Sequence, residues 1–497
     1  MIKKFFLKRN FQTEILSNNE VRPINLMPGP KGFLGLGTIL NYVKPFGSID
    51  WDQLHILGME RYKKYGPIVC EKIMPGASVV WLYDPVDISK VLTDTPGNLP
   101  CRRSHLALEK FRYDRPEVYS SGGLLPTNGE KWWELRSQFQ KHISSPKNVR
   151  NILPSTNQVT REFIEMLASK FDANNTIQDM VTEFDRFSFE MTCLIAFDER
   201  MYSFSESERH PNSISSRLIK AGDDTSCSVL STDNDLQLWR LFETASYRKL
   251  RVAQEYMQQI AIDFVDKRAA KQTDGDSLLD QYLKNPNLSK KDLIGISSDF
   301  LLAGVHTVSF SSAFALYHIA KNKRVQELMH EEAIKVLPSN ESEITTPIMN
   351  NEIPYTRAVL KEVFRLNPIS IGVGRISNQD MVLGGYLIPK NTRIVTQNYI
   401  SCRLDEYFPK PLQFIPERWI KINREKSNIN PYLVIPFGQG MRSCIARRFA
   451  EQTMLVFLLR LLREYKIEWK GIENLGILTK LINRPNSDVT IKFEKRF

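Results

Sequence analysis

The sequence has few cysteines, and none of them form a close pair. Six occur in 497 residues. The lack of C-x-x-C pairs argues against the zinc and iron–sulfur sites that such pairs build. The low cysteine density argues against a disulfide framework. Five are therefore interpreted as small buried hydrophobes, which leaves one to explain. The six are Cys70, Cys101, Cys193, Cys227, Cys402 and Cys444.

Long apolar runs, repeats and nucleic-acid modules are also missing. No run approaches the ~20 apolar residues that span a bilayer, so the sequence predicts no membrane-spanning helix. No internal repeat or low-complexity linker follows residue 32, which argues against a solenoid. No segment interleaves basic clusters with aromatic residues as a nucleic-acid-binding module does. We therefore expect no nucleic-acid partner.

Basic residues are in excess, and they are prominent at the start of the sequence. The formal net charge is +11, which fits an acidic partner or an anionic surface, or equally a merely solvated basic surface. Lys3, Lys4, Lys8 and Arg9 all precede the first acid, Glu14. A basic, acid-poor, amphipathic start is typical of a mitochondrial transit peptide. We expect residues 1–27 to be such a segment; the alternative is a basic N-terminus without a targeting role.

Helical periodicity dominates after residue 128. Short β-type runs occur at 68–70 and 78–83, and extended pieces surround 384–389. The apolar spacing predicts helices at 130–142, 162–171, 180–197, 236–271, 290–322, 325–337, 355–366 and from about 444 to 465. The sequence therefore predicts a mainly α protein with a minor β part.

The strongest local signal is the segment PFGQGMRSCIARRFAE at 436–451. Gly438 and Gly440 allow a tight turn and a close approach of the backbone to a flat cofactor. Cys444 is expected at the start of a helix, where free N–H groups and the macrodipole favour a thiolate. A thiolate ligand donates electron density to haem iron and favours O–O cleavage. Arg442 is close enough in sequence to meet a haem propionate.

This segment resembles the haem-binding loop of the cytochrome P450 superfamily, whose F-x-x-G-x-R-x-C pattern runs here from Phe437 to Cys444. Glu362 and Arg365 match the E-x-x-R helix of that family. Arg418 lies in P-E-R-W, which matches its P-E-R-[FW] segment. The resemblance implies that these three charged residues form an ion network on the proximal side. Each motif alone is weak, whereas the three in this order and spacing are highly specific.

Further positions match residues with which the family holds the haem propionates. Trp132 and Arg136 fit its W-x-x-x-R helix, and the (i, i+4) spacing places both on one face. Arg375 matches a third propionate-binding arginine. The resemblance extends from about Pro28 to the C-terminus and overrides the length prior of about three domains. It implies one domain, residues 28–497, with a cytochrome P450 fold that encloses haem b, the iron of which Cys444 ligates.

The distal side of the haem is represented by AGVHT at 303–307, where the family reads [AG]-G-x-[DE]-T. By resemblance, Gly304 leaves room for dioxygen and Thr307 hydrogen-bonds the oxygen and the water that delivers protons. His306 replaces the usual acid. A histidine relays protons near neutral pH, so we assign it a catalytic role; the alternative is a helix histidine that points away from the iron. Ala446, where most members have glycine, adds a methyl group near the porphyrin.

The segment after the cysteine resembles the mitochondrial branch, which reads C-x-[GA]-R-R-x-A-E. By this resemblance Arg447 and Arg448 dock an acidic [2Fe–2S] ferredoxin, which carries electrons from NADPH by way of a ferredoxin reductase. A basic face steers an acidic carrier. The microsomal alternative would need an N-terminal membrane anchor, which we do not find. We expect the protein on the matrix side of the inner mitochondrial membrane, with peripheral contact to that membrane.

Within this branch, the run at 445–452, IARRFAEQ, resembles the arthropod ecdysteroid-forming enzymes of the disembodied type. The resemblance implies hydroxylation of a steroid at side-chain carbon 22. It places the walls of the substrate pocket at 104–125, 205–235, 298–304 and 369–374. We expect a monooxygenase that inserts one oxygen atom into a steroid C–H bond. The alternatives are an electron-independent haem-thiolate isomerase or dehydratase, and a non-catalytic haem-binding sensor.

Overall fold

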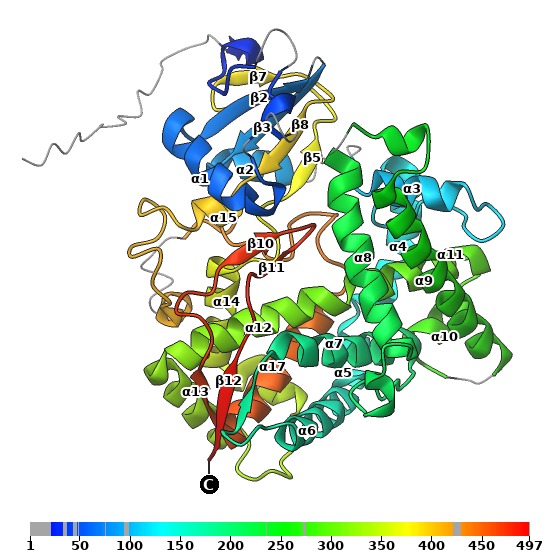
Figure 1. Cartoon of the computed structure of the whole chain (residues 1–497), viewed down its shortest axis with the longest axis vertical. Coiled ribbons are helices and arrows are strands. Elements are labelled where there is room, and N and C mark those ends of the chain that lie inside the picture. Colours follow the sequence, from blue (N-terminus) through cyan, green and yellow to red (C-terminus); the bar gives the residue numbers. More distant parts are fainter. Residues whose placement is uncertain are drawn as a thin grey trace, which may run out of the picture.

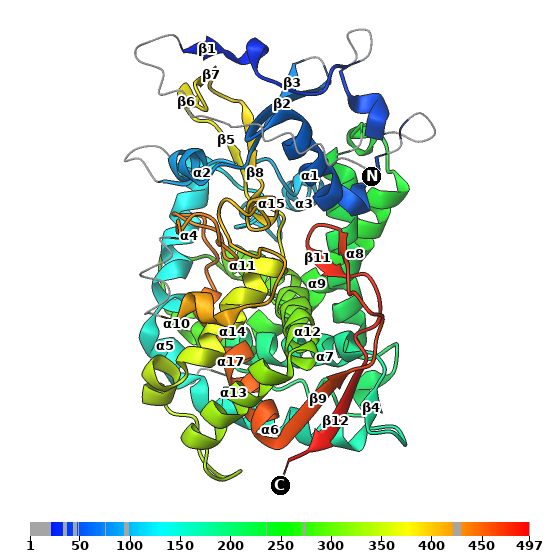
Figure 2. The same cartoon turned by 90° about the vertical axis from the view of Figure 1, so that its left-hand side faces the viewer.

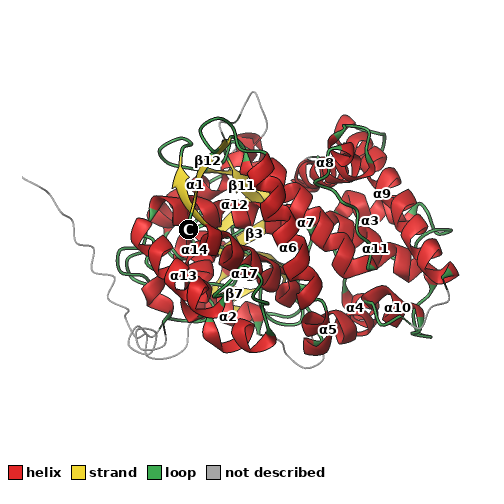
Figure 3. Ribbon diagram, turned by 90° about the horizontal axis from the view of Figure 1, so that it is seen from below, coloured by secondary structure: helices red, strands yellow, loops and turns green. Residues whose placement is uncertain are grey.

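A sheet-rich part and a larger helical part make up the structure (Figure 1). The computed structural model describes residues 21–496 except 33–36, 43–46, 48, 75, 94–98, 235, 272–274 and 421–428. Helices occupy most of the molecule, and the strands gather in a few small sheets (Figure 3). The predicted mainly α class with a minor β part is confirmed.

The sheet-rich part contains a four-stranded sheet in the order β2-β3-β8-β5. The runs predicted at 68–70 and 78–83 pair antiparallel as β2 and β3, and the first is longer than predicted. The strands of this four-stranded sheet are β2 Ile68–Met74, β3 Ala77–Leu82, β5 Gly374–Ile376 and β8 Arg393–Thr396. Helices α1 Leu54–Tyr65 and α2 Pro85–Leu92 lie beside them. A second sheet joins β1 Arg22–Pro23, β7 Tyr386–Ile388 and β6 Met381–Leu383.

The first strand, β1, lies before residue 28, where the sequence places the start of the folded domain. β1 pairs in parallel with β7, and the Arg22 N–H donates to the Gly385 carbonyl at 3.0 Å. Met27 is buried in the core of this sheet region. A two-residue strand and a buried methionine therefore lie before residue 28, and the domain boundary expected there stays a prediction. Residues 1–20 of the predicted transit segment lie outside the described residues.

Most of the predicted helices are present, although some bounds differ and several shorter helices were not predicted. The helix predicted over 236–271 begins only at Ala245, and a separate helix at 214–234 was missed. Serines and threonines fill much of the buried face of that helix, so its apolar pattern is weak. The helices are α3 Leu106–Tyr113, α4 Gly129–Ile143, α5 Pro146–Asn151, α6 Leu153–Ser169, α7 Met180–Phe197, α8 Ile214–Asn234, α9 Ala245–Ala270, α10 Leu278–Leu283, α13 Lys323–Val336, α14 Pro354–Leu366, α15 Asn398–Ser401 and α17 Arg447–Glu464.

The long helix predicted at 290–322 crosses the helical part as two pieces (Figure 1). They are α11 Lys290–Ala303 and α12 Val305–Lys321, and they meet at Gly304. The described part of the chain has one segment long and apolar enough to cross a membrane, Lys290–Lys321, with mean hydropathy 1.4. The expectation that no such segment exists is therefore wrong by length and composition. Because 72% of its window is buried inside the protein, it has the character of a core helix.

The end opposite β1 is closed by a third sheet (Figure 2). It consists of β4 Thr176–Ile177, β12 Ile491–Lys495 and β9 Tyr465–Trp469, and a separate hairpin joins β10 Ile477–Thr479 to β11 Asn483–Pro485. The largest core cluster lies between this sheet and helices α6, α7, α12 and α17. Phe163 stacks on Phe187 with ring centroids 4.6 Å apart, and Phe457 of α17 meets Phe184 edge to face. Well-packed aromatic side chains of this kind hold the helices in a fixed arrangement.

Candidate active site

The loop before Cys444 is held by its own backbone. The Cys444 N–H donates to the carbonyl of Phe437 at 2.8 Å, and the Ser443 N–H donates to that of Gly440 at 2.9 Å. Gly438 and Gly440 have φ values of +70° and +78°, which glycine adopts at little steric cost. The Phe437 ring packs on another aromatic ring at 5.4 Å. The glycine loop predicted from the motif is therefore present, and it presents the cysteine at its end.

The environment of the Cys444 thiol differs in one respect from the expectation. The helix α17 begins at Arg447, with Ala446 as its N-cap residue, so Cys444 precedes the helix rather than starting it. Burial raises the pKa of the Cys444 thiol, and the Ala446 N–H and the charges of Arg136 and Arg447 only partly oppose this. The residue is nevertheless exposed. Since a metal ion deprotonates a coordinating thiol outright, the residue suits an iron ligand.

Behind this loop, the three charged residues of the predicted proximal network make direct contact. The Arg365 guanidinium binds both carboxylate oxygens of Glu362 at 2.8 Å, and neither side chain is exposed. Arg418 lies 3.3 Å from the same carboxylate, and the Trp419 indole N–H donates to it at 2.9 Å. Arg365 also donates to the carbonyls of Cys402 and two later residues. The network fastens α14 to the segment before the cysteine loop.

Four buried or half-buried arginines gather beside the cysteine loop. Arg136 donates to the Ser443 carbonyl at 2.7 Å, and Arg442 lies 4.3 Å over the indole ring of Trp132. Burial lowers the pKa of Arg442 to about 8, and the neighbouring charges of Arg102, Arg375 and Arg136 add to this effect. A guanidinium does not lose its proton in proteins. The depressed pKa therefore expresses the cost of positive charge without a nearby anion.

The arginine cluster provides a test of whether haem fits these residues. Within the described ranges, Arg102, Arg136 and Arg442 form no ion pair with a carboxylate, and two guanidinium nitrogens of Arg442 are buried without a hydrogen-bond partner. Haem carries two propionates that such a cluster would bind. The residues present fit haem.

Arg102 is a further member of the arginine cluster, beside Arg136, but no sequence motif identifies it. Its guanidinium donates to the carbonyl of Leu125, and burial lowers its pKa to about 10. The only signal was the doublet Arg102-Arg103, which is too common to be specific. Its place beside Arg442 depends on a loop that folds over from the sheet-rich part. Periodicity does not reveal such an arrangement.

On the distal side, Ala303 and Thr307 share one face of the broken helix, and the Thr307 hydroxyl donates to the Ala303 carbonyl at 2.8 Å. Such back-bonding often bends a helix, and here it spans the break between α11 and α12. Gly304 faces α7: a Cβ at this position would lie 2.7 Å from Cγ2 of Thr192. Close packing of two helices therefore explains this glycine, and its expected role in making room for dioxygen stays a prediction.

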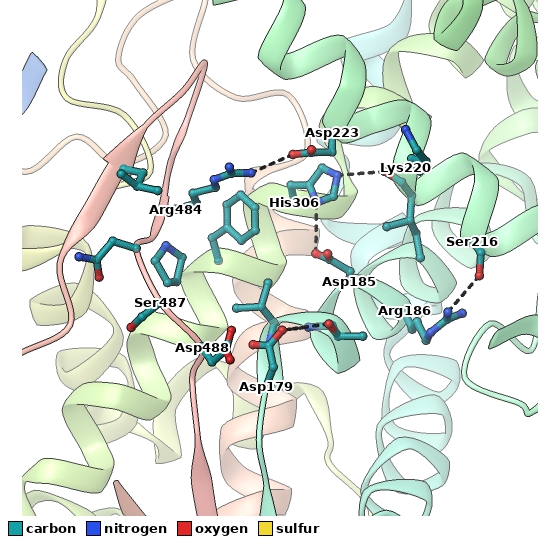
Figure 4. A pocket seen from close by; sticks show the side chains of 17 residues that line it. Asp179, Asp185, Arg186, Ser216, Lys220, Asp223, His306, Arg484, Ser487 and Asp488 are labelled. Atoms are coloured by element: carbon teal, nitrogen blue, oxygen red, sulfur yellow. Dashed lines mark hydrogen bonds and ion pairs between the residues drawn. The ribbon is translucent and has the colours of Figure 1, made fainter. Parts of the chain in front are cut away.

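The ring of His306 is directed toward α7 and α8 (Figure 4). Its Nδ1 lies 3.1 Å from Oδ1 of Asp185, and its Nε2 lies 3.2 Å from the carbonyl oxygen of Ile219. The ring also stacks on Phe310, with centroids 5.4 Å apart. Both nitrogens are thus engaged by other helices. These contacts are compatible with the alternative of a helix histidine that points away from the iron, and the expected direct proton relay stays a prediction.

A cavity of 270 Å³ lies between the sheet-rich part and the helices. Two of the four predicted pocket segments contribute to it, through Leu230 in one and Ile371 in the other. Trp51 and Leu481 also line it and were missed, because they come from opposite ends of the chain and carry no motif. These apolar side chains share the cavity wall with charged ones, among them Arg61, Arg103 and Arg393.

Comparison with known proteins agrees with this site. The sequence profile of the cytochrome P450 family matches residues 27–491. The chain is 48% identical to cytochrome P450 302a1, mitochondrial, of Drosophila melanogaster, over 96% of both chains. It is 28% identical to the probable cytochrome P450 12b2, mitochondrial, of the same species, over 96% of this chain and 90% of that one. It is 27% identical to its ecdysone 20-monooxygenase, over 95% and 88%.

Proposed function

Because the chain belongs to the cytochrome P450 family, and is a mitochondrial haem-thiolate monooxygenase within it, we propose that it hydroxylates an ecdysteroid precursor at side-chain carbon 22. The observation that carries this proposal is the run at 445–452, which resembles ecdysteroid-forming enzymes and follows directly on the ligand cysteine. One relative of the chain is by name a monooxygenase of ecdysone, which supports an ecdysteroid as the substrate class.

The residues of the site have separable tasks in this reaction. Cys444 would bind the haem iron, and Arg136, Arg375 and Arg442 would hold the propionates together with Trp132. Phe437 shields the cysteine loop through its ring contact. When bound, haem supplies the activation of dioxygen and its insertion into a C–H bond. The protein binds and orients the steroid, excludes water and brings protons to the distal face.

Thr307 has the geometry for proton handling on the distal face. Its hydroxyl is held by the Ala303 carbonyl at 2.8 Å, so the hydroxyl oxygen keeps lone pairs free to accept a bond from water. A hydroxyl both donates and accepts hydrogen bonds, and it can therefore exchange partners without leaving its place. Gly304 lets α12 approach α7 closely here, which keeps this turn next to the packed core.

Electrons reach mitochondrial members of the family from a ferredoxin-type carrier. We place its docking face at Arg447 and Arg448 and infer a [2Fe–2S] ferredoxin that a reductase supplies from NADPH. Both arginines are exposed at the start of α17, three and four residues beyond Cys444. Arg448 also donates to the Ser144 carbonyl at 3.2 Å, so the face continues onto the end of α4. Positive charge at this place would steer an acidic carrier toward the ligand cysteine.

An exposed apolar patch between α8 and α9 supports the proposed peripheral membrane contact. Leu241 and Phe242 are 83% and 58% exposed, and Leu238 lies beside them in sequence. Arg240 and Arg248 flank the patch, and basic residues around apolar ones favour an anionic lipid surface. We infer that this patch rests on the inner mitochondrial membrane.

The substrate proposal is tested by turnover. The holoenzyme is incubated with ferredoxin, its reductase, NADPH and a panel of ecdysteroid precursors that differ in side-chain hydroxylation, and products are read by mass spectrometry. We expect a product heavier by one oxygen atom, located at carbon 22, and none without NADPH. Oxygenation elsewhere on the steroid, or conversion without electrons, would contradict the proposal.

The docking face is tested by a double charge reversal, Arg447→Glu with Arg448→Glu. We expect the KM for ferredoxin to rise at least tenfold at low salt and its salt dependence to flatten, with the spectrum of the haem unchanged. The matched control, Lys390→Glu with Lys495→Glu, makes the same change of charge at exposed positions outside α17. Equal kinetics in the two double variants would mean that ferredoxin docks elsewhere.

A further inference from the structure

The two ring nitrogens of His306 both face hydrogen-bond acceptors. Nδ1 is paired with the carboxylate of Asp185 and Nε2 with the carbonyl of Ile219, at 3.1 and 3.2 Å. A neutral imidazole has one N–H and one lone pair, whereas an imidazolium has two N–H groups. Only the protonated ring can donate to both partners. Since the residue is only 5% exposed, these two groups are the main hydrogen-bond partners of its ring.

The charges around the ring support its protonated form. Burial by itself lowers the pKa of His306, but the charge and hydrogen bond of Asp185 and the charge of Asp223 outweigh it, so the pKa is raised. Among the described residues, His306 is the only hydrogen-bonding partner of the Asp185 carboxylate. Asp223 instead binds Arg484 at 3.2 Å, so Asp185 is the acid in direct contact with the histidine.

These groups line a surface pocket of 580 Å³ between three elements (Figure 4). The charged groups that face the histidine come from α7, α8 and the β10–β11 hairpin. Arg186 is directed to Ser216 and to backbone carbonyls rather than to Asp185. The charged residues are Asp179 at the N-cap of α7, Asp185 and Arg186 of α7, Lys220 and Asp223 of α8, Arg484 of β11, and Asp488 after β11. None of the basic ones forms an ion pair with Asp185 in the described structure.

The position of the pair on the distal helix gives it a consequence for the site. His306 is the second residue of α12, directly after the break at Gly304. Thr307, the next residue, bonds back to Ala303 across the same break. The backbone bends at Gly304, although its N–H still donates to the Phe300 carbonyl at 3.0 Å. The contacts of His306 with α7 and α8 hold this bend from two other helices.

We propose that Asp185 is a positioning residue: it keeps His306 doubly protonated, and the pair anchors the turn that carries Ala303 and Thr307 to α7 and α8. The family has an acid at the position of His306. In this protein the acid is Asp185 of α7, which pairs with the histidine. The raised pKa means that the anchor is complete at low pH. It weakens as pH rises through the folded-state pKa of His306, because one of the two bonds is then lost.

The first test measures the protonation of His306 without turnover. Histidine ring carbons are labelled in the reduced, carbon-monoxide-bound holoprotein, which is diamagnetic, and the His306 signal is assigned with His306→Gln. We expect a pKa above 6.5 in the wild type and a loss of at least tenfold in proton affinity in Asp185→Asn. Asp488→Asn, the same change at an exposed carboxylate of the same pocket, should leave the titration unchanged. A neutral His306 at pH 6, or equal titration in the Asp185→Asn protein, would overturn the proposal.

The second test measures the anchor itself. Hydrogen exchange of peptides that cover 303–310 should speed up severalfold in Asp185→Asn, and in the wild type above the pKa of His306, while α13 peptides stay unchanged. Equal exchange in the two proteins would refute a positioning role. The catalytic readout, the share of NADPH electrons that reach product, rests on the proposed monooxygenase function. A wild type that turns over no ecdysteroid would refute that substrate, whereas the titration and exchange results would still decide the role of Asp185.

Discussion

The proximal and distal sides of the site are held in different ways. On the proximal side, Glu362 and Arg365 bind each other from positions three residues apart, within a single helix. On the distal side, His306 is held by Asp185, which lies 121 residues earlier in the chain. A local partner is visible in a motif, whereas a distant partner becomes visible only when the fold brings two helices together. The proximal motifs therefore have direct structural counterparts, whereas no motif reveals the partner of the histidine.

The largest effect is expected where the proximal network is cut. In Glu362→Gln, the buried Arg365 loses its carboxylate, and an uncompensated buried charge costs about 3–5 kcal/mol. We expect a marked fall in the thermal midpoint and in the haem retained on purification. Glu451→Gln is the matched control, because Glu451 pairs with a half-exposed Arg447 and such pairs contribute roughly 0–1 kcal/mol. Similar losses in both variants would mean that the network has no special weight.

A smaller effect is expected on the distal side, at the break in the helix. Gly304→Ala would press a methyl group against Thr192 of α7, and overpacking of this kind costs about 1–3 kcal/mol. Denaturant unfolding should show the loss, and Thr192→Ala in the same chain should restore most of it. Gly295→Ala in α11 is the control, since its nearest neighbour would be 3.9 Å away. A stable Gly304→Ala protein would show that α7 and α12 have room to spare.

Removal of one charge from the arginine cluster should have opposite effects on the stability of the haem-free protein and on the retention of haem. Arg442→Leu removes a buried charge that lacks an anion, so the haem-free protein should be at least as stable as the wild type. The haem-bound protein should release haem about tenfold faster, measured by transfer to an excess of apomyoglobin, because one charge-assisted bond is worth ~1.5–3 kcal/mol. Arg240→Leu, an exposed arginine far along the chain, should change neither. Unaltered haem release would remove Arg442 from the propionate site.

Much of the proximal side could be predicted from the sequence because its contacts repeat local spacings. The glycine loop, the pair Glu362 and Arg365, and the (i, i+4) pair Trp132 and Arg136 all follow from distances along the chain. The fold class and most helices follow from the period of apolar residues. The start of α17 was misplaced by three residues, since the turn after Cys444 has the composition of a helix.

What could not be predicted depends on segments that meet across the fold. Arg102 joins the arginine cluster from a loop beside the sheet, and Asp185 reaches His306 from another helix. The helix at 214–234 was missed because small polar residues fill its buried face. The contact of Gly304 with Thr192 of α7 is likewise absent from any motif. In each case the deciding contact is with a residue that no sequence window contains.

The assignment of Cys444 as the thiolate ligand of haem is central to the proposed site. The spectrum of the reduced, carbon-monoxide-bound protein tests this assignment most directly. We predict a band at about 450 nm in the wild type, as thiolate ligation in this family produces, and its loss in Cys444→Ala. Cys101→Ala, at a half-buried cysteine near the arginine cluster, should keep the band. A Cys444→Ala protein that retains the band would contradict the assignment and the site built upon it.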